Sequence, residues 1–441
     1  MSSAYFFEGQ KFLDFSNDTI VRDKLQEALG FSANLPLGDY YKKFSDEFPR
    51  DKKILDKLFF ESIMYSRLKN VYLDRMNTVN IEVPIFKKRM HSLIYNINGG
   101  KRVELEKYMS VDGFYLMDAL NITEIGLTFL AGYDYEETAD HKVKTARYLF
   151  FQVVPMKKEG TTGYLVAGVE FDFKSQVILT SIRNNTNDIK RDYNSGEEGF
   201  KKNWEENLEN FYLTIKNIIL SNLGLKDQVE SLEDRDIPSS DFHYKKDRES
   251  MYNMFQLLDE QLLSDYRDEL NRRLGNSSEE VTNELIKKID RFNHYNNSKL
   301  KDDFKQRLDA LLLSTLISVS ADDEDIVNLA KSKKMIGFPT RISFKSSSSG
   351  QGSTGSSGKD SPISGMEMFH SLYIDFKDAL ELPMWSISWF ADIHHKSSSN
   401  NEVVQTSIEV NQRFFRITFK NKNYLNKELI HHVVNSISKF R

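Results

Sequence analysis

The stretch ARYLFFQVVPMKKEGTTGYLVAGVEFDFKSQVILTSI, residues 146–182, decides the fold class. It contains three segments rich in Val, Ile, Leu, Phe and Tyr, the residue types that favour β-strands. The first two are separated by the turn region 157–163, and the last two by a very short turn near Lys174 and Ser175. Neighbouring strands joined by such short connections pair antiparallel, so this stretch predicts a β-meander.

Towards the N-terminus the sequence mixes helical and alternating patterns. Asn17 or Asp18 can cap a helix that ends at Gly30, and another helix is predicted after Pro49. From about residue 77 the pattern alternates, so further strands are predicted. They are VNIEVPIF (79–86), HSLIYNI (91–97) and KRVELEKYM (101–109). Residues 1–196 are therefore predicted to form an α+β domain that contains the meander.

Towards the C-terminus a helical region precedes a second β-rich region. Residues 197–337 carry apolar residues at helical spacing and predict an antiparallel bundle or arm. Residues 338–441 are predicted to form a sheet with a closing helix. The predicted strands are RISF (341–344), HSLYIDF (370–376), MWSISWFADI (384–393), EVVQTSIEV (402–410) and RFFRITF (413–419). Helices and strands segregate along the chain, which predicts the α+β class.

The composition excludes several classes of site. The 441 residues include no cysteine, which excludes disulfides, thiolate zinc sites and cysteine nucleophiles. The N-terminus lacks the basic and apolar regions of a signal peptide, and the longest apolar run, residues 308–319, is too short to span a bilayer. We therefore expect a cytoplasmic protein that does not enter a membrane.

The segment KSSSSGQGSTGSSGKDSPISG, residues 345–365, is the one abrupt change of composition. A phosphate-binding P-loop requires GxxxxGK[ST] followed by a helix. Here Ser353 stands at the position of the first glycine, Asp360 follows Lys359, and a strand is predicted next. The segment is therefore interpreted as a flexible Ser/Gly loop inside the C-terminal sheet.

Two patterns could carry metal chemistry. Asp375 and Lys377 form an acid-x-Lys pair at the end of the predicted strand 370–376, and Asp360 precedes them. Nucleases of the PD-(D/E)xK type use such residues to bind magnesium and orient water. Asp392 and His394 share a face of another strand end and are candidate metal ligands. The alternative for Asp375 and Lys377 is a surface ion pair, and the alternative for Asp392 and His394 is a histidine cluster at the boundary of a helix face. No cofactor is expected except magnesium for the nuclease.

Basic and aromatic residues alternate near the C-terminus, as they do on strands that stack bases and contact phosphates. The candidate nucleic-acid ligands of this region are Arg413, Phe415, Arg416, Lys420 and Lys422. Lys87, Lys88 and Arg89 form a second basic cluster in the first β region. The alternative is that the aromatic residues face the core and the charges protect an edge strand.

The sequence therefore favours a non-catalytic scaffold or adaptor. Its composition resembles that of bacterial or phage proteins, and large α+β proteins without familiar motifs are often components of mobile-element or defence complexes. The helical region is expected to bind a protein partner, and the β regions to contact DNA or RNA. The alternative is the magnesium-dependent nuclease with Asp360, Asp375 and Lys377.

Overall fold

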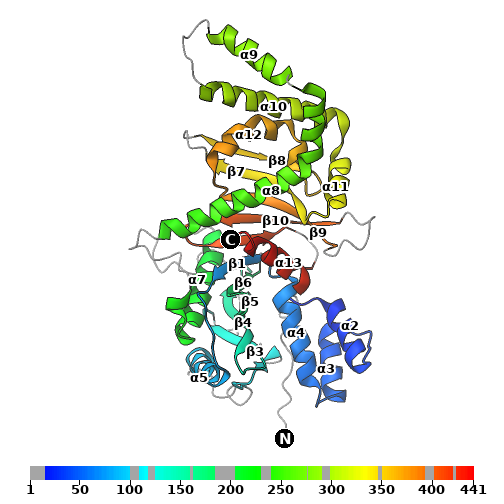
Figure 1. The fold of residues 1–441 in the computed structure, drawn as a ribbon. Helices are drawn as coiled ribbons and strands as arrows, with labels where there is room; N and C mark the ends of the chain where they lie inside the picture. Colours follow the sequence, from blue (N-terminus) through cyan, green and yellow to red (C-terminus); the bar gives the residue numbers. More distant parts are fainter. Residues whose placement is uncertain are drawn as a thin grey trace. The chain divides into compact units, whose positions relative to one another are not determined.

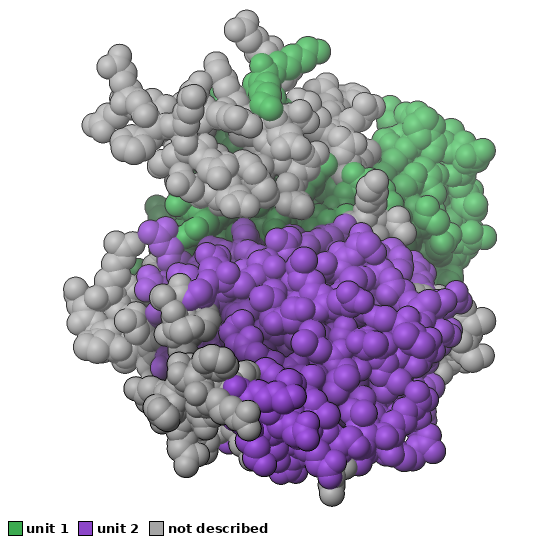
Figure 2. Space-filling model, turned by 90° about the horizontal axis from the view of Figure 1, so that it is seen from above, with its two compact units in different colours: residues 1–231, 423–427 green, residues 232–422, 428–441 purple. Residues whose placement is uncertain are grey.

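The structure is a computed structural model in which the chain forms two compact units. It describes residues 15–99, 109–117, 125–158, 162–183, 204–229, 240–275, 277–290, 298–345, 350–392, 402–420 and 424–441. Unit 1 comprises residues 1–231 and 423–427, and unit 2 comprises residues 232–422 and 428–441, as coloured in Figure 2. The three domain ranges inferred from the sequence remain a prediction.

Unit 1 contains an antiparallel sheet built around the meander (Figure 1). Its described strands are ordered β2-β3-β4-β5-β6-β1. Their bounds are β1 (Asn70–Arg75), β2 (Phe114–Tyr115), β3 (Thr128–Glu137), β4 (Val143–Pro155), β5 (Thr162–Asp172) and β6 (Val177–Ile182). The meander predicted over residues 146–182 is confirmed, with Ala146 opposite Phe171 and Val169 opposite Thr180.

Helices cover both faces of the unit 1 sheet. The described helices are α2 (Asp18–Leu29), α3 (Leu37–Glu47), α4 (Lys52–Ser66), α5 (Val83–Ile94), the π-helix η1 (Tyr95–Gly99), α7 (Trp204–Asn222) and the 3-10 helix η3 (Lys226–Gln228). Helix α4 packs on one face, where a Cβ on Gly168 would lie 2.6 Å from the sulfur of Met64. On the other face the ring of Tyr212 in α7 stacks on Tyr72 of β1, with centroids 4.1 Å apart.

Two of the strands predicted in this region are wrong. Residues 83–94 form helix α5, in which Pro84 occupies the first turn, where it removes no helical hydrogen bond. Val83, Phe86, Met90 and Leu93 are buried at helical spacing. The alternation in this short segment therefore did not distinguish a strand from a helix. The predicted strand 101–109 lies outside the described residues except for Met109.

Unit 2 contains an antiparallel sheet whose described strands are ordered β11-β10-β9-β7-β8. The strands are β7 (Gly337–Lys345), β8 (Gln351–Gly355), β9 (Met384–Phe390), β10 (Val403–Val410) and β11 (Phe415–Phe419). Its helices are α8 (Ser240–Leu274), α9 (Ser277–Asp290), α10 (Ser298–Ser320), α11 (Asp323–Ser332), the 3-10 helix η4 (Ile363–Gly365), α12 (Glu367–Ala379) and α13 (Lys427–Ser438). Together the two units confirm the α+β class.

Helices of unit 2 pack on one face of its sheet. The ring of Phe255 in α8 lies 6.0 Å from Trp385 of β9, and the ring of Phe376 in α12 lies 5.4 Å from Phe344 of β7. Successive side chains of a strand point to opposite faces. Ser386 of β9, which follows Trp385, therefore points to the face opposite these helices.

The predicted strand 370–376 is also wrong, because these residues lie in helix α12. Phe369, Tyr373 and Phe376 recur at helical spacing, and the rings of Phe369 and Phe376 both pack near Phe255. A short apolar run is compatible with either a strand or a buried helix. Consequently the Ser/Gly segment is not followed by a strand.

Replacement of Phe255 tests the core of unit 2. Phe255→Ala removes a fully buried ring that contacts Trp385 and Phe376, so it should reduce the free energy of unfolding by about 3–5 kcal/mol. Leu257→Ala on the same helix is the matched control, because Leu257 is 51% exposed. This substitution should change the free energy of unfolding by less than about 1 kcal/mol. Chemical denaturation of both variants measures the difference, and equal effects would contradict the packing described here.

Candidate functional site

A cavity of about 500 Å³ lies in unit 2 against the face of the sheet opposite α8 and α12. Its floor comes from strands β7, β9 and β10 and from Lys420, which follows β11. One wall comes from β8 and the turn after it, and Met368 of α12 lies at its rim. The hydroxyl groups lining it belong to Thr340, Ser353, Thr354, Ser356, Ser357 and Ser386.

The register of the sheet assembles the cavity from distant parts of the chain. Gly355 of β8 pairs with Arg341 of β7, which in turn pairs with Ser386 of β9. The main-chain N–H of Lys420 donates to the carbonyl oxygen of Gln405 at 2.9 Å. Five residues, four from different strands and one that follows β11, thus line one cavity.

The Ser/Gly segment forms the wall of the cavity and is not one continuous loop. Residues 351–355 form strand β8, and the N–H of Ser356 extends the pairing by donating to the carbonyl of Thr340 at 2.8 Å. The hydroxyl of Ser388 donates to the carbonyl of Lys359 at 2.5 Å. Residues 346–349 lie outside the described residues. The interpretation of residues 345–365 as a flexible loop between two strands is therefore wrong, because β8 lies within it and helix α12 follows it.

Glycine is required in this wall by close contacts. A Cβ on Gly352 would lie 2.5 Å from the ring of Phe344, which is closer than two carbon atoms can approach. A Cβ on Gly355 would lie 3.2 Å from the Cγ of Arg341 and would press on this side chain. The glycine-rich composition of this segment resembles that of a flexible tether. The same glycines let β8 pack closely on β7.

The electrostatics of the cavity favour an anion. Arg341 and Lys420 line it, and none of its lining residues, all of which belong to the described part of the chain, is acidic. Desolvation lowers the pKa of Lys420, and the positive charge of Arg341 lowers it further. The Lys420 ammonium donates to the Ser386 hydroxyl at 3.3 Å, whereas the Arg341 guanidinium has no hydrogen-bond or ion-pair partner among the described residues. An anion bound between the two cations would offset their repulsion.

Of the basic and aromatic residues predicted to bind nucleic acid near the C-terminus, the structure places Lys420 in the cavity. Arg416 forms an ion pair with Glu409 at 2.5 Å, and Phe415 is buried beneath Arg441, whose guanidinium lies 4.2 Å from the ring centroid. Arg413 is in the turn before β11, where its N–H donates to the side chain of Asn411 at 2.8 Å. Lys422 lies outside the described residues.

The basic cluster of unit 1 lies on helix α5 and does not converge on one point. Lys87 pairs with Asp112 at 2.5 Å. Arg89 donates to the carbonyl of Leu223, at the end of α7, at 2.6 Å. Lys88 is exposed. Two of the three cations thus have structural partners.

The candidate nuclease residues are not arranged as that chemistry requires. Asp375 and Lys377 lie on helix α12, not at a strand end, and contact helix α10. Asp375 pairs with Arg307 at 3.2 Å, and Lys377 donates to the side chain of Gln306 at 3.2 Å. Asp360 is exposed beside Lys359 at 3.8 Å. The placement of the acid-x-Lys pair on a strand is therefore wrong.

The predicted metal ligands are only partly described. Asp392 follows β9, and His394 lies outside the described residues. No group of three His, Cys, Asp or Glu residues within the described ranges could hold a metal ion.

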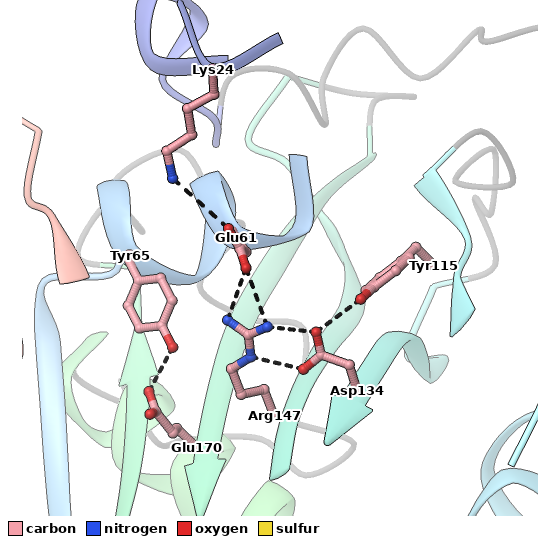
Figure 3. A network of polar contacts seen from close by, with 7 residues as sticks. All are labelled: Lys24, Glu61, Tyr65, Tyr115, Asp134, Arg147 and Glu170. Atoms are coloured by element: carbon pink, nitrogen blue, oxygen red, sulfur yellow. Dashed lines mark hydrogen bonds and ion pairs between the residues drawn. The ribbon is translucent and has the colours of Figure 1, made fainter. Parts of the chain in front are cut away.

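A second polar cluster lies in unit 1, between α4 and the sheet (Figure 3). The Arg147 guanidinium donates two hydrogen bonds to Asp134, at 2.8 and 2.6 Å, and also contacts Glu61 at 3.3 Å. The Tyr115 hydroxyl donates to Asp134 at 2.8 Å, which helps to raise the pKa of Tyr115, although burial is the larger cause. Burial alone would lower the pKa of Arg147, but the hydrogen bonds and charges of its acidic neighbours raise it above its usual value. The charges of this cluster are compensated internally, which is typical of a structural network.

The set of residues that lines the cavity was only partly apparent in the sequence. Arg341 and Ser343 alternate with the buried residues Ile342 and Phe344, so the open face of β7 could have been recognised. The strand order that brings Arg341 close to Lys420 has no signal in the sequence.

Comparisons with protein-family models, curated proteins and solved structures found no match for this chain. The two polar clusters are therefore the features from which a function can be inferred.

Replacement of Arg147 tests the structural role of the unit 1 cluster. Arg147→Met leaves the carboxylates of Asp134 and Glu61 without their buried partner and should reduce the free energy of unfolding by about 3–5 kcal/mol. Lys24→Met is the control within the same cluster, because Lys24 is 52% exposed and lies 3.9 Å from Glu61. It should change stability by less than about 1 kcal/mol. A stable Arg147→Met variant would argue that this cluster serves binding instead.

Proposed function

We propose that the protein is a non-catalytic scaffold or adaptor that contacts nucleic acid through the cavity of unit 2. The observation that supports this proposal is the pair Arg341 and Lys420 in a hydroxyl-lined cavity without an acidic lining residue. Phosphate groups carry the charge and the acceptor oxygens that such a set of donors suits. The guanidinium supplies a planar set of N–H donors, and the ammonium supplies a compact charge.

The adaptor part of the proposal is supported by the helices of unit 2. Helix α8 is 35 residues long, and large apolar side chains are exposed on α8, α9 and α10. They include Leu257, Val281, Leu285, Leu311 and Val319. Such side chains suit contacts with a protein partner. We propose a bacterial or phage assembly, antiviral defence among the candidates, in the cytoplasm.

None of the helices in the described ranges has the length and apolar character needed to cross a membrane. The nuclease alternative lacks a supporting observation, because its acid and lysine lie on a helix with other partners.

Removal of the two cations tests phosphate binding. Arg341→Gln and Lys420→Gln should each weaken binding of a fluorescent oligonucleotide by roughly tenfold at low salt, and each should lower the slope of log affinity against log salt by about one. Fluorescence anisotropy over a salt series measures both quantities. Lys287→Gln removes an equivalent charge from an exposed position of α9 and should leave affinity unchanged. Unaltered affinity in both cavity variants would contradict the proposal.

The lowered pKa of Lys420 predicts a pH dependence of binding. The protonated ammonium attracts phosphate, so affinity is present below the pKa of Lys420 and is lost as pH rises through it. Because this pKa is lowered, the loss should begin at a lower pH than for an ordinary lysine. A probe of oligo-adenylate avoids titration of the bases. Lys420→Arg, which stays charged, should remove the alkaline loss, and an identical profile in this variant would argue against Lys420 as the titrating group.

A further inference from the structure

We infer that the cavity holds the ribose-phosphate part of one nucleotide, so that the protein prefers single-stranded RNA to DNA. This inference rests on the proposed function and specifies its ligand. It follows from the size of the cavity, from the chemistry of its lining and from the position of Gln405.

The size of the cavity suits one nucleotide unit. Its volume of about 500 Å³ lies within the range of pockets that enclose small ligands. In a duplex each nucleotide is held in place by pairing and stacking, whereas a single strand can turn one unit into a pocket. A cavity that is open to solvent, with the sheet as its floor and β8 as one wall, can therefore receive one unit of a single strand.

The lining selects the sugar and the phosphate and does not select the base. None of the lining residues, all of them described, is aromatic, so the cavity lacks a ring on which a base could stack. Its polar groups are hydroxyls, one amide and two cations. Hydroxyls both donate and accept hydrogen bonds, which matches the hydroxyl-bearing ribose, and the cations match the phosphate.

Gln405 is the residue that would distinguish ribose from deoxyribose. Its amide nitrogen donates to the Thr340 hydroxyl at 2.8 Å, which orients the side chain and leaves its carbonyl oxygen as an acceptor. Lys420 is next to Gln405, because the Lys420 N–H donates to the Gln405 main-chain carbonyl. The 2′-hydroxyl of a ribonucleotide is a donor adjacent to the 3′-phosphate. An acceptor beside a cation therefore matches the 2′-hydroxyl and phosphate of one ribonucleotide.

The experiment measures how tightly oligo-adenylate RNA and oligo-deoxyadenylate DNA of equal length bind the full chain. Competition anisotropy gives the two affinities. The expected result is tighter binding of RNA by roughly 3- to 10-fold, the effect of one hydrogen bond. RNA with 2′-O-methyl groups should bind like DNA, because the methyl group removes the donor. This comparison uses the unaltered protein, so misfolding of a variant cannot account for its result.

Variants then assign the preference to Gln405. Gln405→Met keeps the length of the side chain and removes its acceptor, so RNA affinity should fall to that of DNA while DNA affinity stays within about twofold. Gln351→Met is the matched control, because Gln351 is an exposed residue of β8 that does not line the cavity. Competition by AMP and dAMP tests whether the site prefers a nucleotide within a strand or a free nucleotide. Displacement by AMP at the concentration that RNA requires would assign the site to free ribonucleotides and would overturn the inference that its ligand is single-stranded RNA.

The failures of the two proposals are distinguishable. Equal affinity for RNA and DNA in the unaltered protein, or a preference for RNA that survives Gln405→Met, would overturn the ribose inference and leave nucleic-acid binding intact. Absence of binding to either strand at low salt would remove the proposed function itself.

Discussion

The unit 2 sheet depends on one constraint: helices α8 and α12 pack on the same face of it. Phe255 of α8 and Phe376 of α12 contact Trp385 and Phe344 on that face. Because side chains alternate along a strand, burial of these rings directs the intervening residues to the opposite face. The polar residues of the cavity are thus positioned by the apolar packing behind them. A one-residue shift of register would reverse both faces together.

The two polar clusters differ in how their charges are balanced. In unit 1, Arg147 is surrounded by Asp134 and Glu61, which match its donors at short distances. In unit 2, Arg341 and Lys420 share a cavity without an acidic lining residue. A buried charge with its partners in place contributes to the structure, whereas cations that lack such partners are available to a ligand. Unit 2 is therefore the part of the chain better suited to bind an anion.

The sequence predicted the α+β class and the meander because long strands rich in branched and aromatic residues have a strong pattern. It failed over residues 83–94 and 370–376, where short apolar runs fit either period and tertiary packing selects the helix. Lys420, which lines the cavity, was a candidate ligand because of its basic and aromatic neighbours, and its role stays a prediction. Arg341 was missed because it reaches the cavity through the pairing of β7 with β9, which is not local in sequence.

Strand β8 ends the sheet of unit 2, and its composition has a consequence for self-association. An exposed edge strand presents unpaired main-chain groups that another chain can extend into an aggregate, especially when apolar side chains support the contact. The sequence of β8, QGSTG, has no large apolar side chain to bury in such a contact. The residues that build this wall of the cavity therefore also make the edge a poor template for aggregation.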